Sequence, residues 1–322
     1  MKIVITGCAG FIGANFTEYW LKNYPKDKIV GIDCLTYAAN IPVLIAFQQC
    51  ENFTFYKTNI CNRQEIEQIF KNESPDIVIN FAAESHVDRS IADSRIFVET
   101  NVLGTQTLLD ICLKYGVKRF HQISTDEVYG DLPLDTDEAF IEDSPLKPSS
   151  PYSVSKAAAD LLVLSYYRTY DLPVSISRSA NNYGKYQHSE KLIPKAIKYA
   201  LQDAPIPIYG HGLNIRDWLH VEDHCRAIDL IVRKGAVGAV YNVGGGVLLK
   251  NLDLVKQILR KLDKPEDLIT FVADRKGHDR KYALNCENLI SGLGWKPQIN
   301  FSNGLKETIG WYREFINGVV QS

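Results

Sequence analysis

Long apolar runs are missing from this chain of 322 residues. None approaches the roughly 18 consecutive apolar residues that a membrane-spanning helix needs, so a membrane is not an expected partner. The opening stretch, "MKIVITGCAGFIGANF", also lacks the charged segment and long apolar stretch of a secretory signal. We therefore expect a cytoplasmic protein.

Closely spaced cysteines and complete metal-binding motifs are also missing. The seven cysteines are scattered, odd in number and never arranged as C-x-x-C, which is typical of free thiols in a reducing compartment. His220 and His224 in "HVEDH" are four residues apart, but their order differs from H-E-x-x-H. No third ligand follows at a suitable spacing, so we expect no metal site.

An excess of charge of one sign is absent as well. The chain has 36 Lys+Arg against 38 Asp+Glu, a formal net charge of −2, which gives no global attraction to nucleic acid. Its hydrophobic content of 45% and charged content of 23% are those of an ordinary globular protein. A chain of this length predicts one large domain and one smaller one.

What is present is a regular alternation of strand-like and helix-like segments over the first 180 residues. We expect strands at residues 2–6, 28–33, 53–59, 76–83, 118–125 and 172–180, and helices at residues 9–22, 62–71, 94–115 and 153–170. This order predicts an α/β fold, a Rossmann-like doubly wound parallel sheet with a smaller mixed α/β domain. Residues 205–214 are expected to form a loop, and two helices are expected from residue 251 onward.

A glycine-rich turn joins the first strand to the first helix. Gly7, Gly10 and Gly13 form G-x-x-G-x-x-G in the order that lets a pyrophosphate approach a helix N-terminus. Asp33 ends the second strand, 20 residues after Gly13. An acid there accepts hydrogen bonds from ribose hydroxyls and disfavours a 2′-phosphate, which indicates NAD rather than NADP. The alternative is that Asp33 caps the next helix.

Two further motifs carry candidate chemistry. "PYSVSK" places Tyr152 and Lys156 one turn apart on one helix face, where an ammonium group favours the phenolate. "STDEVYG" places Thr125, Asp126 and Glu127 at the end of an apolar strand. Two buried carboxyl groups cannot both ionise cheaply, so one of the two pKa values is expected to rise. Both side chains reach one ligand only if the chain leaves the strand there.

Together, the glycine turn, "STDEVYG" and "YSVSK" resemble the extended short-chain dehydrogenase/reductase superfamily. Within it the chain is most similar to the nucleoside-diphosphate-sugar 4,6-dehydratases. The resemblance continues through "GIDCLTYAAN", "NFAAESHVDRSI", "NNYG", "EKLIP", "NIRDWLHVEDH" and "GHDRKYAL", and so covers nearly the whole chain. The Thr-Asp-Glu triplet separates this family from epimerases and simple dehydrogenases of the same fold.

The resemblance implies an NAD-dependent lyase, a hydro-lyase, and a role for each catalytic residue. Tyr152 removes the proton of the sugar's C4 hydroxyl while hydride passes to NAD, Lys156 keeps Tyr152 anionic, and Thr125 steadies the C4 oxygen. Glu127 takes the C5 proton, and protonated Asp126 donates to the departing C6 hydroxyl. Hydride then returns to C6, which leaves a 4-keto-6-deoxy sugar.

The resemblance also implies a domain division and two sets of binding residues. Residues 1–180 form the NAD-binding Rossmann domain, with a later contribution from about 212–245, and residues 181–322 form mainly the nucleotide-sugar substrate domain. The implied NAD contacts are Gly7, Gly10, Phe11, Ile12, Gly13, Asp33, Cys34, Leu35, Thr36, Asn59, Ile60, Ala82, Ala83, Ser85, Thr100, Tyr152, Lys156 and Asn182. The implied substrate contacts are Ser85, Thr125, Asn181, Lys191, Leu192, Pro207, Ile208, Tyr209, Arg216, Asn251, Asp274, Arg275, Lys276, Gly277 and His278.

Several residues depart from the pattern of the family. Asn59 replaces an aspartate near the adenine, and Lys276 replaces a proline. Lys185, His188 and Ser189 change the run close to the sugar. These changes surround the base and the sugar, so they leave the substrate open. dTDP-glucose is favoured, and UDP-glucose or UDP-N-acetylglucosamine is the alternative.

Other functions also stay open at this point. An epimerase or decarboxylase of the same fold would not need both Asp126 and Glu127, and epimerisation at C5 within the same reaction is another possibility. A non-catalytic NAD-binding sensor would not need Tyr152 or Lys156. The family also implies a homodimer that pairs through the helices at 94–115 and 153–170.

Overall fold

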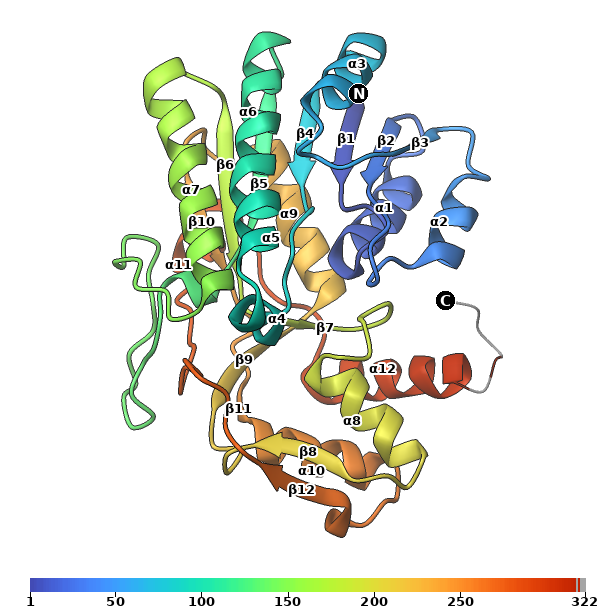
Figure 1. The fold of residues 1–322 in the computed structure, drawn as a ribbon, viewed down its shortest axis with the longest axis vertical. Helices are drawn as coiled ribbons and strands as arrows, with labels where there is room; N and C mark the ends of the chain where they lie inside the picture. The colour runs from blue at the N-terminus through green and yellow to red at the C-terminus, as the bar shows by residue number, and fades with distance from the viewer. Residues whose placement is uncertain (317, 319–322) are drawn as a thin grey trace.

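The fold is built on a seven-stranded parallel sheet (Figure 1). The computed structural model describes residues 1–316 and residue 318. The strand order is β10-β6-β5-β4-β1-β2-β3, and every neighbouring pair is parallel. The strands are β1 (Lys2–Thr6), β2 (Lys28–Asp33), β3 (Phe53–Lys57), β4 (Ile77–Asn80), β5 (Arg119–Thr125), β6 (Val174–Ser179) and β10 (Val240–Val243). The Rossmann-like sheet predicted from the sequence is confirmed.

Helices cover both faces of this sheet, because alternate side chains of each buried strand point to opposite sides. Ile3 and Ile5 pack with α1 (Phe11–Asn23), α2 (Ile41–Phe47) and α9 (Val221–Lys234). Val4 between them packs with α3 (Arg63–Glu73), α6 (Gly104–Lys114) and α7 (Pro151–Tyr170) on the other face. The two apolar layers hold the strands in one register and fix their carboxyl ends along a single edge.

The helix expected at residues 94–115 has an internal irregularity. It is continuous from α5 (Arg95–Phe97) through a π-helical turn (Val98–Leu103) into α6. Thr100 and Asn101 lie in this turn, and Asn101 is buried. The Asn101 amide donates to the Glu84 carbonyl (3.0 Å) and to Ser155 Oγ (2.8 Å). The turn therefore links the loop after β4 to the start of α7.

The remaining elements form a smaller layer below the carboxyl edge of the large sheet (Figure 1). β7 (Asn181–Tyr183), β9 (Ile215–His220) and β11 (Leu248–Lys250) form one sheet, and β8 (Ile206–Tyr209) pairs with β12 (Ile269–Val272). The helices of this layer are α8 (Leu192–Leu201), α10 (Asn251–Lys261) and α12 (Phe301–Ile316). α11 (Glu287–Leu293) packs instead beside β10 and α9 (Figure 1), and α4 (Val87–Ala92) follows β4. The chain re-enters the large sheet through α9 and β10, but the exact domain boundaries stay a prediction.

Two expectations about this layer were wrong. Residues 205–214 contain β8 rather than only a loop, because Ile206 and Ile208 are buried in the core of the layer and β12 supplies a pairing strand about 60 residues later. From residue 251 the described part of the chain forms three α-helices and a short 3-10 helix (Glu266–Leu268), not the two helices expected. All seven cysteines lie in the described part of the chain and are free, as expected. No helix within residues 1–316 is long and apolar enough to cross a membrane.

A buried ion pair joins α7 to the sheet. Arg178 on β6 donates from Nε to Asp160 Oδ2 on α7 (2.9 Å), and the two side chains are 3% and 0% exposed. We expect Asp160→Ala to lower the free energy of unfolding by about 3–5 kcal/mol, because it leaves a guanidinium buried without its partner. A urea-unfolding curve followed by circular dichroism measures this loss.

The control removes an exposed pair of the same chemistry. Arg95 and Glu99 are 2.7 Å apart on the surface, with side chains 82% and 42% exposed. Arg95→Ala is expected to change the free energy of unfolding by less than about 0.5 kcal/mol. Equal losses in the two variants would contradict a special role for burial.

Candidate functional site

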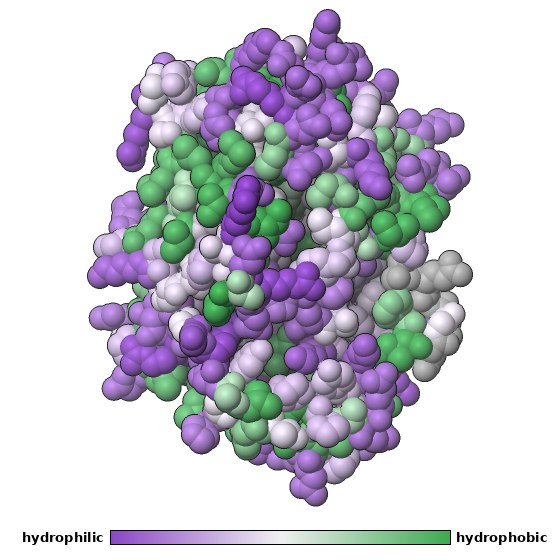
Figure 2. Space-filling model, in the orientation of Figure 1, coloured by the Kyte–Doolittle hydropathy of each residue, from purple (hydrophilic) through white to green (hydrophobic). Residues whose placement is uncertain are grey.

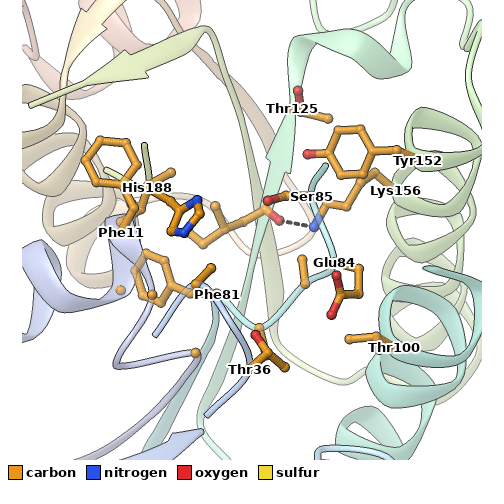
Figure 3. Close-up of a pocket in the computed structure, with 18 of the residues that line it drawn as sticks. Phe11, Thr36, Phe81, Glu84, Ser85, Thr100, Thr125, Tyr152, Lys156 and His188 are labelled. Carbon is orange, nitrogen blue, oxygen red and sulfur yellow. Dashed lines mark hydrogen bonds between the residues drawn. The ribbon is translucent and has the colours of Figure 1, made fainter. Parts of the chain in front are cut away.

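A cavity of ≈ 340 Å³ opens at the carboxyl ends of the parallel strands. It is lined by the segments that follow β1, β2, β4, β5 and β6, and by the start of α7. In open α/β sheets this edge is where ligands bind. Figure 3 shows Thr125, Tyr152 and Lys156 on one side of the pocket, and Phe11, Phe81 and His188 on the other.

The glycine turn after β1 forms one wall that leaves no space for side chains. Gly7 has φ +67°, and a Cβ there would lie 2.7 Å from Ala82 N. A Cβ on Gly13 would lie 2.1 Å from Gly7 O, so α1 begins directly against the turn. The first N–H groups of α1 therefore face the cavity without side-chain cover, which is the arrangement that accepts a pyrophosphate.

Asp33 lies at the end of β2 with its carboxylate held by the backbone. Oδ1 accepts from Leu35 N (2.8 Å) and Oδ2 accepts from Ala9 N (3.0 Å). It does not cap α2, whose N-cap is Asn40, so the alternative interpretation of Asp33 was wrong. Leu35 itself packs against the core and does not line the cavity, although its φ of 58° turns the chain there.

The Thr-Asp-Glu triplet lies where β5 ends. Thr125 is the last residue of the strand, and Asp126–Val128 form a 3-10 turn that lets both carboxyl groups reach the cavity. Thr125 Oγ1 donates to Asp126 Oδ1 (3.2 Å) and accepts from Glu127 N (3.3 Å). Asp126 Oδ2 is buried and has no hydrogen-bond partner among the described residues. A ligand hydroxyl would satisfy this oxygen.

The surroundings of Asp126 and Glu127 shift the pKa values of the two carboxyl groups to different extents. Burial raises the pKa of Asp126 well above its usual value, and the Glu127 charge raises it further. Burial also raises the pKa of Glu127, but Arg275, Arg216 and Lys191 oppose this shift. Asp126 is therefore favoured as the protonated partner and Glu127 as the anionic one.

Tyr152 and Lys156 lie on the first turns of α7. Ser150 caps this helix in a capping box with Ser153, which fixes where the helix begins. Both functional side chains are buried, and Lys156 Nζ donates to the Ile123 carbonyl (2.6 Å). Burial lowers the pKa of Lys156 to about 8.

The expected lowering of the Tyr152 pKa is not found in this structure. Burial raises the pKa of the Tyr152 phenol, and the carboxyl groups of Glu127 and Asp126 raise it further. Lys156 directs its ammonium group to a carbonyl of β5.

The cavity brings together most of the residues expected to bind a cofactor. All five expected catalytic residues line it, and so does every expected cofactor contact except Leu35. Among the expected substrate contacts, Ser85, Thr125, Asn181 and Lys191 line it as well. Asn181 Oδ1 is buried without a hydrogen-bond partner among the described residues, so it is available to a ligand.

The other expected substrate contacts lie outside the cavity lining, on the smaller layer. They are Leu192, Pro207, Ile208, Tyr209, Arg216, Asn251, Asp274, Arg275, Lys276, Gly277 and His278. Ile208 is 2% exposed and packs in the core of that layer, so its side chain is not available to a ligand. Tyr209 donates to Asp88 Oδ2 (2.9 Å), and His278 Nδ1 lies 2.7 Å from Asp274 Oδ1.

Arg216 is held by two residues that the sequence reasoning did not single out. Its NH2 donates to the Asp279 carbonyl (2.9 Å), and its guanidinium lies 4.2 Å from the centroid of the Tyr282 ring. The Tyr282 hydroxyl donates to Asp279 Oδ2 (2.6 Å). All three residues are buried, so Arg216 presents a fixed positive charge close enough to lower the pKa of Glu127.

Further cavity-lining residues were also missed. Phe81 and Glu84 follow β4, and Gln187 and Glu190 follow β7. The rule that ligands contact segments after parallel strands would have found Phe81 and Glu84, because both lie at the predicted edge. The sequence carried no comparable signal for Gln187 and Glu190.

Comparisons with known proteins agree with this geometry. A family model described as GDP-mannose 4,6 dehydratase matches residues 4–308. A dTDP-glucose 4,6-dehydratase of Haemophilus influenzae is 49% identical over 332 residues, which cover 97% of this chain and 98% of that protein.

Two solved structures match over nearly the whole chain. The dTDP-glucose 4,6-dehydratase of Bacillus anthracis, solved with NAD, is 46% identical, covers 98% of this chain and 97% of its own, and has a TM-score of 0.91. The dTDP-glucose 4,6-dehydratase of Streptomyces venezuelae, also solved with NAD, is 42% identical. It covers 99% of this chain and 98% of its own, and has a TM-score of 0.95. The chain therefore belongs to the GDP-mannose 4,6 dehydratase family of nucleotide-sugar-modifying proteins.

Proposed function

We propose that this protein removes water from a nucleoside-diphosphate hexose, with dTDP-glucose as the favoured substrate, and forms the 4-keto-6-deoxy sugar. The protein is an enzyme of the hydro-lyase class, and its cofactor is NAD. The observation that carries the proposal is that Asp126 and Glu127 share the cavity with Tyr152. A simple dehydrogenase or epimerase needs only one acid–base pair, whereas water elimination needs a second.

The cofactor site fits NAD by the chemistry of its walls. The glycine turn and the start of α1 would hold the pyrophosphate, and Asp33 would accept from the ribose hydroxyls. When bound, NAD supplies a hydride acceptor that later returns the hydride. Protein side chains do not accept a hydride in this way, so the cofactor supplies the redox chemistry.

The protein residues move the protons. Tyr152 takes the proton of the C4 hydroxyl as a phenolate, which requires Lys156 to turn its ammonium group from the Ile123 carbonyl toward the phenol. Thr125 donates to the C4 oxygen. Glu127 takes the proton from C5, which the neighbouring C4 ketone has made acidic. Asp126 donates a proton to the C6 hydroxyl, which departs as water. The raised pKa of Asp126 supports its role as the acid, and the cations that oppose the rise at Glu127 support its role as the base.

A diphosphate is supported by the charges next to the cavity. Lys191 lies at the N-cap of α8 with its Nζ 2.9 Å from the Ser85 carbonyl, and Arg216 is buried on β9. Arg275 lies 3.9 Å from Asp88. Arg275 faces Asp88, but no ion pair is found for Lys191 or Arg216 within residues 1–316, which leaves their positive charge for phosphate oxygens. The similarity to dTDP-glucose 4,6-dehydratases supports dTDP over UDP.

A second copy of the chain is the proposed partner. Apolar side chains gather over α6 and α7 in Figure 2, which has the orientation of Figure 1. On these two helices and the preceding π-helical turn, Val98, Leu103, Leu113, Val154 and Leu161 are 38–59% exposed. A contiguous apolar helical face of this kind is typical of a protein–protein contact. We propose a homodimer in the cytoplasm.

The proposed reaction predicts a defined product in deuterated water. Purified protein is offered dTDP-glucose, UDP-glucose and UDP-N-acetylglucosamine in turn, and mass spectrometry follows the products. We expect dTDP-glucose to lose water fastest and its product to carry one deuterium at C5, because Glu127 exchanges its proton with solvent. Deuterium at further carbons would add an epimerase step. Failure of every donor to lose water while NAD is bound would favour the sensor.

The carboxyl variants separate the two proton transfers. Glu127→Gln and Asp126→Asn are each expected to lower the rate of water loss by about 10²–10⁴-fold, the usual contribution of a general acid or base. The Asp126→Asn variant should still oxidise the sugar at C4, and the absorbance of the reduced cofactor measures this step. Glu67→Gln removes an exposed carboxylate on α3 and serves as the matched control. An unchanged rate in either site variant would refute its assigned role.

The raised pKa of Asp126 also predicts the pH dependence of stability. When folding raises the pKa of a carboxyl group, the group costs no stability below its ordinary pKa. As the pH rises from there toward the pKa of the folded state, the free energy of unfolding falls, because the unfolded chain gives up the proton more readily. Asp126→Asn is therefore expected to be more stable than the wild type, by a margin that grows from about pH 4 upward. Urea midpoints at several pH values measure this margin. A variant less stable than the wild type at neutral pH would contradict the buried, neutral state of Asp126.

The proposed dimer predicts which surface substitution changes assembly. Leu161→Glu places a charge in the apolar face of α7, and the protein is expected to sediment as a monomer while its circular dichroism stays unchanged. The control is Ile45→Glu on α2, where a side chain of similar exposure (54%, against 59% for Leu161) lies outside this face. Loss of assembly in the control, or its persistence in Leu161→Glu, would refute the location of the interface.

A further inference from the structure

The segment of residues 185–191, here called the strap, connects β7 to α8 and is tied to the large-sheet side of the cavity. Asn15 on α1 donates to the Lys185 carbonyl (3.0 Å), and Asn40 donates to the Tyr186 carbonyl (3.1 Å). Tyr186 has φ 70°, a conformation uncommon for a residue with a Cβ, and this residue turns the chain back over the cavity. The backbone of the strap is therefore held against α1 and the loop before α2.

Glu190 is the residue at which the strap meets two other segments. Its Oε1 accepts from the Tyr37 hydroxyl (3.2 Å). Its Oε2 lies 3.3 Å from His86 Nε2, 3.6 Å from His188 Nδ1 and 3.9 Å from Arg89 NH2. The Glu190 side chain is only 14% exposed, so these groups replace most of its contact with water. One carboxylate thus joins the segment after β2, the segment after β4 and the strap.

The partners of Glu190 also contact one another. The Arg89 guanidinium lies 3.5 Å from the centroid of the Tyr37 ring, and the His188 ring meets the same ring edge-on at 5.4 Å. Lys191 Nζ donates to the Ser85 carbonyl (2.9 Å), which adds a second link between the strap and the segment after β4. These contacts form one connected cluster, here called the clasp.

The clasp lies at the cavity that the glycine turn also lines. Gln187, His188 and Glu190 contribute to the same lining as Gly10 and Phe11. Figure 3 shows His188 between Phe11 and Phe81 at the wall opposite Tyr152. A ligand that fills this cavity is therefore in contact with the strap.

This inference rests on the proposed function, which explains why the clasp would be needed. The reaction needs the hydride that leaves C4 to return to C6, so the same cofactor molecule must stay in place between the two transfers. We propose that Glu190 is a positioning residue that keeps the strap closed over the dinucleotide, through Tyr37, His86 and Arg89. Its role is to retain the cofactor rather than to move a proton.

Release of the cofactor tests this role without turnover. The full-length protein is loaded with radiolabelled NAD, freed of excess by rapid gel filtration, and mixed with unlabelled NAD, and the label that stays bound is followed in time. Glu190→Gln keeps the size of the side chain and its ability to accept from Tyr37, but it removes the charge. We expect release about tenfold faster than in the wild type or more, and tenfold corresponds to ~1.4 kcal/mol.

Two further variants define the specificity of the effect. Tyr37→Phe keeps the ring under Arg89 and removes only the hydroxyl donor, so it is expected to accelerate release less than Glu190→Gln. Glu266→Gln is the matched control, because Glu266 also pairs with two cations, Lys256 (2.8 Å) and Arg260 (3.2 Å), but lies on the smaller layer. Its release rate should equal that of the wild type.

Turnover supplies a second readout that a merely structural role would not change. The kcat of Glu190→Gln is expected to be higher with saturating NAD than after free NAD is removed, whereas the wild type should keep the same kcat in both conditions. Reduced cofactor should then accumulate in solution. Unchanged release in Glu190→Gln, or equal acceleration in Glu266→Gln, would overturn the clasp. A wild-type protein that binds no NAD would instead overturn the proposed function.

Discussion

The arrangement of this site depends on burying two adjacent carboxyl groups at the end of one strand. Ionising both in a closed space is costly, so burial and mutual repulsion raise the pKa of Asp126, while nearby cations limit the rise at Glu127. This difference persists only if water is kept out and if the cations are fixed. The parallel sheet meets the first condition, because β5 is buried along its whole length and delivers the pair to the covered edge. The smaller layer meets the second through Arg216, Arg275 and Lys191.

Arg216 is itself fixed by contacts that carry no charge, whereas Arg275 lies 3.9 Å from Asp88. Arg216 stacks on Tyr282 and donates to a backbone carbonyl, and among the described residues no carboxylate pairs with it to cancel its charge. A buried arginine that has a carboxylate partner, such as Arg178 with Asp160, stabilises the fold instead. The two arginines show how one residue type serves two purposes, depending on whether its charge is neutralised locally.

Much of the large sheet and of the cavity was predictable from the sequence, because both follow from local patterns. The strands are apolar runs, the glycine turn has fixed spacing, and Tyr152 and Lys156 need only helical periodicity to share a face. The carboxyl ends of parallel strands meet by geometry, so the triplet and the glycine turn had to lie near each other. The reactions assigned to these residues, however, came from family resemblance and not from spacing.

What could not be predicted depends on contacts between distant segments. β8 exists because β12, far along the chain, pairs with it, and "PIPIYG" alone favours a loop. The Tyr152 pKa depends on how deeply the phenol is buried beside two carboxyl groups, which spacing on a helix does not report. Glu190 seemed to be an ordinary charged residue before α8, and three of its partners, Tyr37, His86 and Arg89, lie 100 or more residues earlier in the chain.

The strap connects the two layers of the protein, and its residues contact both of them. Lys191 contributes a cation that lowers the pKa of Glu127, and the residue before it, Glu190, holds the segments around the cofactor cavity. A shift of the strap would therefore loosen the cofactor and also weaken the base. In the proposed reaction, which oxidises and then reduces the same sugar, this coupling would favour completion over release, because the conformation that retains the dinucleotide also holds Lys191, one of the cations that oppose the raised pKa of Glu127.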